Sequence, residues 1–309
     1  MSKPALLIVQ PHLAFLAAVL EPHFTVWKFW EHPPIEAQGQ IEAMVVAGEF
    51  PVDKSLVDRL PKLGLIACFT TGYDGVDLAW AAGRGLKVTH SPGVNHEDVA
   101  DHAMGLMLSA WRGLSRGERQ LRGGGWAAHE KMVTPSLEGR KAGIVGLGDI
   151  GAAIACRAEA FRLELAWWGP REKPDAPWPR VASLVELARR SDILFVACRA
   201  NEETRGLIDA AVIEALGPQA LLVNVSRGQV VDEEALIAAL KGGKLGMAGL
   251  DVFALEPTPA ERWAGIPNAV LTPHTAGATT AAVPKMVAMT LQTLQRWFAG
   301  EPLENEARP

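Results

Sequence analysis

Short apolar runs along the chain alternate with stretches whose apolar residues recur at helical spacing. Runs of about four to eight apolar residues predict buried strands, and apolar residues three and four apart predict the inner face of a helix. In the first 95 residues we expect strands at 5–9, 25–27, 43–47, 65–69 and 87–89, and helices at 13–20 and 55–60. This alternation is typical of a parallel sheet covered by helices.

A second series of the same kind follows residue 141. We expect strands at 142–145, 163–168, 193–198, 220–225, 245–252 and 269–272, and helices at 152–161, 183–190, 211–216 and 233–241. Further helices are expected at 97–111 and 284–298, with an irregular connection at 112–138. The chain therefore belongs to the α/β class with doubly wound parallel sheets. The predicted domains are residues 1–95 with 284–309, and residues 96–283.

Three glycines mark the start of the second series. Gly146, Gly148 and Gly151 have G-x-G-x-x-G spacing between an expected strand and an expected helix. The first glycine allows a tight turn, the second lets the backbone approach a pyrophosphate, and the third lets the helix pack on the strand. The helix N-terminus adds N–H groups and the positive end of its dipole. An ordinary glycine-rich turn is the alternative, but the complete strand–turn–helix context favours a dinucleotide site.

Composition and charge exclude several classes of protein. The 309 residues are 49% hydrophobic with a net charge of −5, which gives no electrostatic basis for binding nucleic acid or an anionic membrane. We expect no signal peptide and no transmembrane segment. Cys68, Cys156 and Cys198 fit buried thiols of a reducing compartment, so we expect a cytoplasmic protein. His96 and His102 do not share a helix face, which argues against a metal site.

Charged side chains follow three strands of the second series. Arg227 follows the strand at 220–225, Asp251 and Glu256 follow the apolar run 245–250, and His274 follows the strand at 269–272. Carboxyl ends of parallel strands meet at one edge, which also holds the glycine fingerprint. Each residue alone has an ordinary explanation, such as a surface loop or a helix start. Together a cation, a carboxylate and a histidine beside a nicotinamide are the parts that hydride transfer to a keto acid needs.

These motifs resemble the D-isomer-specific 2-hydroxyacid dehydrogenase family over nearly the whole chain. The matching stretches are 71–77, 88–93, 98–108, 143–151, 224–236, 249–257 and 272–277. The resemblance implies two Rossmann-like domains, with the cofactor domain inserted into the substrate domain. It also implies a small 2-keto acid as substrate, and a homodimer whose subunit contact lies near the long helix after Asn95.

The resemblance further implies a role for each matching residue. Arg227 pairs with the carboxylate and keto oxygen of the substrate, His274 is the acid/base, and Glu256 orients it. The backbone at Gly72 and Tyr73 cradles the substrate carboxylate, and Asp251 holds the nicotinamide carboxamide. The expected cofactor contacts are Gly146, Leu147, Gly148, Asp149, Ile150, Gly151, Gly169, Pro170, Arg171, Lys173, Cys198, Arg199, Thr204, Val225, Ser226, Arg227, Asp251, His274 and Gly277.

The end of the second strand of the cofactor domain predicts which dinucleotide binds. An NAD-specific site carries an acid there for the ribose hydroxyls, and this chain has Gly169 instead, followed by Arg171 and Lys173. This stretch, like Ala197 and Cys198, resembles the NADP-preferring branch that includes glyoxylate/hydroxypyruvate reductases. Arg199, where the family often has proline, adds a third positive charge. We expect NADPH to be preferred and NADH to be usable with lower affinity.

Two other functions fit the same motifs. An NAD-dependent D-2-hydroxyacid dehydrogenase of another substrate would keep the enzyme class, and Gly169 weighs against it. A dinucleotide-sensing corepressor would bind partner proteins, and the short stretch after the last helix weighs against it. The keto acid is also open, because glyoxylate, hydroxypyruvate, 2-ketogluconate and phenylpyruvate present the same groups to Arg227. The loop at 123–131 matches the family only loosely, which leaves the side-chain pocket undefined.

Overall fold

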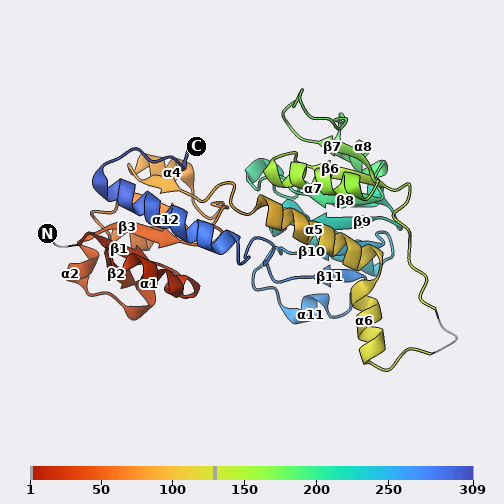
Figure 1. Ribbon diagram of the computed structural model, residues 1–309, viewed down its shortest axis with the longest axis horizontal. Coiled ribbons are helices and arrows are strands. Elements are labelled where there is room, and N and C mark those ends of the chain that lie inside the picture. The colour runs from red at the N-terminus through yellow and green to blue at the C-terminus, as the bar shows by residue number, and fades with distance from the viewer. Residues whose placement is uncertain (1–2, 128–130, 309) are drawn as a thin grey trace. The chain divides into compact units, whose positions relative to one another are not determined.

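The computed structural model describes residues 3–127 and 131–308 and divides the chain into two units. One unit is Met1–Asn95 with Thr280–Pro309, and the other is His96–Thr279 (Figure 1). The second unit is thus inserted into the first. The chain returns to the first unit at Thr280, four residues before the position expected from the sequence, 284.

The first unit contains a six-stranded sheet in the order β12-β5-β4-β3-β1-β2. Strands β1 (Ala5–Ile8), β2 (Thr25–Lys28), β3 (Ile41–Val46), β4 (Leu65–Cys68) and β5 (Lys87–Thr89) are parallel, as the apolar runs predict. The sixth strand, β12 (Glu306–Ala307), pairs antiparallel with β5 and was not predicted. Two residues are too few to form a recognisable apolar run.

Helices cover both faces of this sheet. On one side α1 (Ala17–Leu20) and α12 (Ala282–Ala299) bury a core with β1, β3 and β4, and on the other α3 (Lys54–Asp58) and α4 (Leu78–Gly83) bury a second core. Asp53 and Asp77 cap α3 and α4 by accepting a backbone N–H. The remaining short helical turns are η1 (Pro11–Leu16), η2 (Phe29–Glu31) and α2 (Ile35–Gln38).

The second unit contains a fully parallel sheet in the order β11-β10-β9-β8-β6-β7. Its strands are β6 (Lys141–Val145), β7 (Glu164–Trp168), β8 (Ile193–Val196), β9 (Leu221–Asn224), β10 (Met247–Leu250) and β11 (Ala269–Leu271). The strand order reverses between β6 and β8. In doubly wound sheets this switch point opens a crevice at the carboxyl ends of the strands, where ligands bind.

The helices of the second unit bury two cores, one on each face of its sheet. On one face lie α5 (His96–Trp111) and α7 (Asp149–Ala160), and on the other α8 (Leu184–Arg189), α9 (Ala210–Leu216) and α10 (Glu233–Lys241). The shorter elements are η3 (Glu202–Thr204), η4 (Gly228–Val230) and α11 (Ala260–Trp263).

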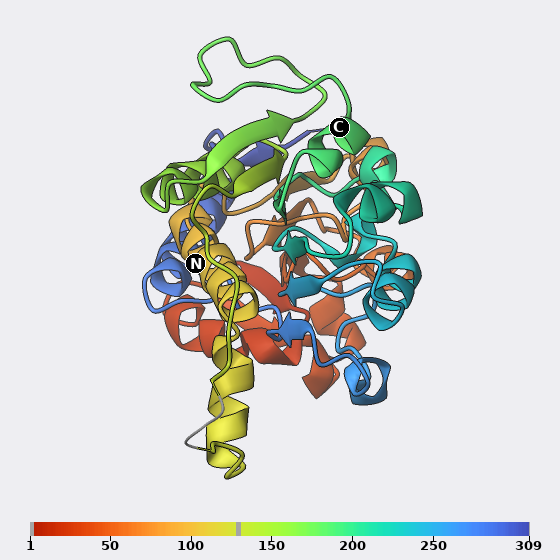
Figure 2. The ribbon, with the colours of Figure 1, turned by 90° about the vertical axis from the view of Figure 1, so that its right-hand side faces the viewer.

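The irregular connection expected at 112–138 is partly wrong, because it contains α6 (Leu114–Arg122). This helix projects away from the sheet of its unit (Figure 2) and has no buried residue. Its only large apolar side chains, Leu114 and Leu121, are exposed and seven residues apart, which is too few apolar positions for the pattern to predict a helix. Elsewhere, no helix in the described part of the chain is long and apolar enough to cross a membrane.

Candidate active site

The glycine fingerprint forms the turn between β6 and α7. Gly146 has a φ of +88°, and a Cβ there would lie 2.5 Å from the Cα of Cys198. A Cβ on Gly151 would lie 2.0 Å from the carbonyl oxygen of Gly146, whereas one on Gly148 would meet no atom within 4 Å. Gly146 and Gly151 are therefore required for close backbone packing, and Gly148 leaves open space at the helix N-terminus. No side chain caps this end of α7, so the turn fits a dinucleotide pyrophosphate.

His274 and Glu256 form a hydrogen-bonded pair after β11 and β10. Nδ1 of His274 lies 2.6 Å from Oε2 of Glu256, whose Oε1 accepts the backbone N–H of Phe253 at 2.9 Å. His274 has a left-handed backbone with a φ of +51°, and its N–H donates to the carbonyl of Asp251 at 2.9 Å. A non-glycine residue in this conformation is uncommon and concentrates at functional sites. The bond at Nδ1 leaves Nε2 as the ring nitrogen that can exchange a proton with a ligand.

The two groups shift one another's pKa in opposite directions. Burial alone lowers the pKa of His274, but the hydrogen bond and negative charge of Glu256 outweigh it, so the pKa of His274 is raised. Burial alone raises the pKa of Glu256, but its bond to His274 and that imidazolium charge outweigh it, so the pKa of Glu256 is lowered. The pair therefore favours a charged imidazolium beside a carboxylate.

Arg227 lies beside this pair, in the loop after β9. Its Nη1 donates to the carbonyl of Ser226 at 2.8 Å, and the Asn224 side chain ties the loop by donating to the Arg227 carbonyl at 3.1 Å. A Cβ on Gly228 would lie 1.9 Å from the carbonyl carbon of Phe253, so this loop packs directly on the loop that carries Glu256. The charge of Arg227 lowers the pKa of both Glu256 and His274. The structure thus brings together the three predicted catalytic residues.

Asp251 anchors the loop that carries His274. Its carboxylate is buried and accepts from Thr272 Oγ1 at 2.6 Å and from the backbone N–H groups of Thr275 and Ala276 at 3.0 and 2.9 Å. Burial alone raises the pKa of Asp251, but these bonds, with one from His102, outweigh it and lower that pKa. His102 Nε2 lies 2.8 Å from Thr272 Oγ1. Sequence reasoning considered His102 as a metal ligand and missed this contact, which no local pattern signals.

The other predicted cofactor contacts lie along the same edge or just beyond it. Asp149, Ile150 and Gly151 form the first turn of α7 after Leu147, and Val225, Ser226 and Gly277 belong to the loops after β9 and β11. Cys198 and Arg199 follow β8, and Thr204 closes the capping box of η3 with Asn201. Burial raises the pKa of the Cys198 thiol to about 11, which keeps it protonated. The expectation of three buried thiols is correct for Cys68 only, because Cys198 is half-buried and Cys156 is exposed on α7.

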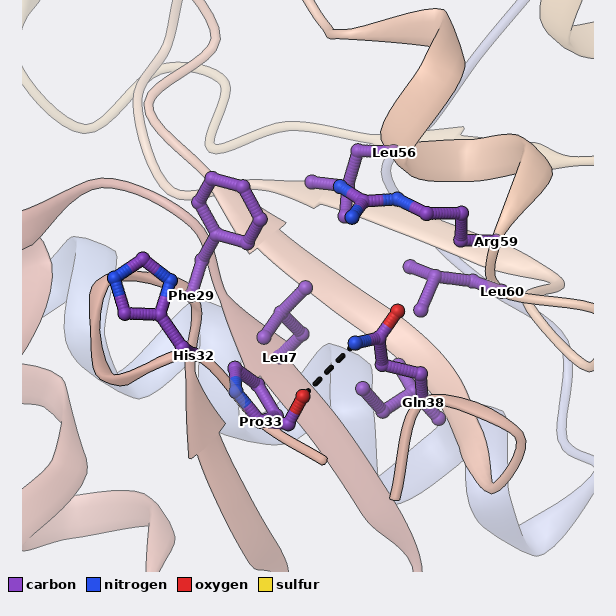
Figure 3. A pocket seen from close by; sticks show the side chains of 9 residues that line it. Leu7, Phe29, His32, Pro33, Gln38, Leu56, Arg59 and Leu60 are labelled. Carbon is purple, nitrogen blue, oxygen red and sulfur yellow. Dashed lines mark hydrogen bonds between the residues drawn. The ribbon is translucent and has the colours of Figure 1, made fainter. Parts of the chain in front are cut away.

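The predicted substrate loop of the first unit follows β4. Gly72 and Tyr73 are half-buried there, and the Tyr73 ring packs edge-on against His90 with 4.6 Å between ring centroids. A Cβ on Gly48 would lie 2.2 Å from the Gly72 carbonyl oxygen, so the loop is closely packed at the carboxyl end of its strand. This unit also has a cavity of about 210 Å³ lined by Leu7, Phe29, His32, Pro33, Gln38, Ile41, Leu56, Arg59 and Leu60 (Figure 3). None of these nine residues is a predicted site residue.

A match to a protein-family model shows to which family the chain is related. The model of the D-isomer specific 2-hydroxyacid dehydrogenase, NAD binding domain, matches residues 104–276. The chain belongs to this family. It is therefore an NAD(P)-dependent 2-hydroxyacid dehydrogenase, and the fold and the domain insertion expected from the resemblance are confirmed.

Relatives and solved structures indicate which reductases of this family the chain resembles. The dehydrogenase is 38% identical over 303 residues to hydroxyphenylpyruvate reductase of Plectranthus scutellarioides, with 96% of each chain covered. It is 38% identical over 308 residues to glyoxylate/hydroxypyruvate reductase A of Arabidopsis thaliana, with 98% of each covered. The NADPH-dependent glyoxylate/hydroxypyruvate reductase of Sinorhizobium meliloti, solved with NADP and malonate, superposes with a TM-score of 0.91 at 34% identity, covering 99% of this chain and 97% of that one.

Proposed function

We propose that this dehydrogenase reduces small 2-keto acids of the glyoxylate/hydroxypyruvate class to D-2-hydroxy acids with NADPH. The observation that carries the proposal is the His274–Glu256 pair beside Arg227, on the edge that holds the glycine fingerprint. The nicotinamide supplies the hydride when the cofactor is bound. Arg227 binds the substrate carboxylate and stabilises charge on the keto oxygen, to which His274 delivers the proton. Asp251 holds the carboxamide, and Gly72 and Tyr73 cradle the carboxylate.

The proposed preference for NADPH rests on the residues at the cofactor edge. Gly169 occupies the position where an acid would repel a 2′-phosphate. Positive charge is supplied by Arg171, Lys173 and Arg199. We also propose that the protein is cytoplasmic and forms a homodimer. Light scattering of the purified protein tests the homodimer. Turnover of glyoxylate, hydroxypyruvate, 2-ketogluconate and phenylpyruvate with each cofactor tests the activity. Negligible turnover of all four would favour a dinucleotide sensor, and a preference for NADH would favour an NAD-dependent dehydrogenase.

Glu256→Gln is expected to move the alkaline limb of the pH profile for keto-acid reduction to lower pH. Reduction needs protonated His274, so the rate holds at low pH and falls as the pH rises through the pKa of His274. Glu256 raises that pKa, and the amide removes its charge. The measurement is kcat/KM against pH, with the exposed Glu186→Gln as the control. A limb that stays in place contradicts the role of Glu256.

Arg171→Ala is expected to raise the KM for NADPH by roughly tenfold while leaving that for NADH nearly unchanged. Arg171 can make a forked, charge-assisted contact with a phosphate, which is worth about 1.4 kcal/mol or more. Initial rates at saturating keto acid with each cofactor give the two constants. Equal losses with both cofactors mean that Arg171 does not recognise the 2′-phosphate.

A further inference from the structure

The loop after β7 leaves the sheet at Gly169 and returns to the same strand. The Trp167 N–H donates to the carbonyl of Pro179 at 3.0 Å, and the Val181 N–H donates to the carbonyl of Trp167 at 2.9 Å. These bonds form a parallel bridge between Trp167 and Arg180, beyond which the loop projects at the top of Figure 2. Arg180 therefore lies next to Gly169, although the two residues are eleven positions apart in the sequence.

The Arg180 side chain is held by the carbonyl of Gly169, the first residue after β7. Its Nε and Nη2 donate to the carbonyl oxygen of Gly169 at 3.2 and 2.8 Å, and its guanidinium carbon lies 5.8 Å from the Trp167 ring centroid. Nη1 is 4.0 Å from Oε1 of Glu172, an 85% exposed carboxylate. About a third of the Arg180 side chain (32%) stays exposed, so its remaining N–H groups are accessible to a ligand.

Trp167 also restricts which side chain can occupy position 169. A Cβ on Gly169 would lie 3.3 Å from Cζ3 of Trp167. That ring is buried, and its Nε1 donates to the carbonyl of Trp178 at 3.0 Å, which leaves it little freedom to move. A side chain at the place where an NAD-specific site has an acid would therefore require the Trp167 ring to shift by a few tenths of an ångström, and a fixed cation lies beside this place.

We propose that Arg180 is a specificity-determining residue that contacts the 2′-phosphate of NADPH. The proposal rests on the proposed NADPH preference and adds a residue to Arg171 and Lys173. Those two side chains are exposed on the projecting loop and lose rotamer freedom when they bind. Arg180 is already held by Gly169 and Trp167, so its contact with a phosphate costs less conformational entropy.

Binding of 2′,5′-ADP and 5′-AMP to the full chain, measured by calorimetry, tests this role, because the two ligands differ only in the 2′-phosphate. Arg180→Met keeps the length of the side chain and its packing on Trp167 but removes the charge. It is expected to weaken 2′,5′-ADP binding about tenfold and 5′-AMP binding less than about twofold. Arg180→Lys keeps the charge without the fork and is expected to fall between Arg180→Met and the parent. Arg190→Ala, an exposed arginine paired with Glu186 at 3.5 Å, is the control and is expected to change neither.

Three other outcomes would overturn the proposal. Equal losses of both ligands in Arg180→Met would show that Arg180 only ties the loop, and no loss of either would show that it does not face the phosphate. Both results overturn the proposal while the NADPH preference stands. If the parent chain itself binds 5′-AMP as tightly as 2′,5′-ADP, the NADPH preference fails, and the role of Arg180 fails with it.

Discussion

His274→Ala is expected to lower kcat for keto-acid reduction by roughly 10²-fold or more, the usual scale for losing a general acid. Arg227 cannot replace the lost donor, because a guanidinium does not release its proton in proteins. The pair with Glu256 favours the charged imidazolium and orients the ring, so the alanine variant loses a proton donor that is already positioned. Stopped-flow or steady-state oxidation of NADPH with saturating keto acid gives the value.

The Kd of NADPH separates a catalytic defect from a folding defect. It is expected to stay within about threefold in His274→Ala, because the imidazole acts on the substrate and the pyrophosphate binds at the fingerprint turn. His23→Ala, which replaces an exposed histidine of the other unit, is the matched control. A near-normal kcat in His274→Ala would remove this residue from the reaction.

Arg227→Gln is expected to lower kcat/KM for glyoxylate on the order of 10³-fold, or about 4 kcal/mol of transition-state stabilisation. The loss combines a charge-assisted contact to the carboxylate with stabilisation of the developing charge on the keto oxygen. Arg227→Lys keeps the charge but not the fork and is expected to recover part of the rate. Arg205→Gln, an exposed arginine paired with Glu202, is the control. A loss below about tenfold contradicts substrate binding by Arg227.

Arg227→Gln is also expected to shift the pH profile of keto-acid reduction. Arg227 lowers the pKa of His274, so removing its charge raises that pKa and moves the alkaline limb to higher pH. Glu256→Gln moves the limb in the opposite direction. Two neutral substitutions around one imidazole that shift its titration in opposite directions are hard to explain by general loosening of the fold.

Apolar runs predict the strands because a parallel sheet is buried on both faces. The five parallel strands of the first sheet and all six strands of the second were found in this way. The turn at Gly146 was predictable because its three glycines follow a fixed spacing within six residues of chain, between an apolar run and a helical pattern. Local sequence patterns therefore predicted most of the fold and the position of the cofactor edge.

What the sequence could not show depends on contacts between distant residues or on exposed elements. The bond between His102 and Thr272 joins residues 170 positions apart. Arg180 reaches Gly169 only because the loop closes on itself. The polar helix α6 and the short strand β12 bury too little apolar surface to leave a pattern. Assembly of Arg227, Glu256 and His274 was inferred from topology, but their distances and orientation were not.

The order in which the units can fold follows from the insertion of His96–Thr279. This unit is continuous in the chain, so all of it is synthesised before α12 and β12 of the other unit. During that interval the first five strands lack the helix whose Ala282, Met286 and Leu294 complete their core. An uncovered apolar sheet face is a site for aggregation and chaperone binding. The first five strands therefore stay without α12 for as long as the whole of the inserted unit, His96–Thr279, is being synthesised.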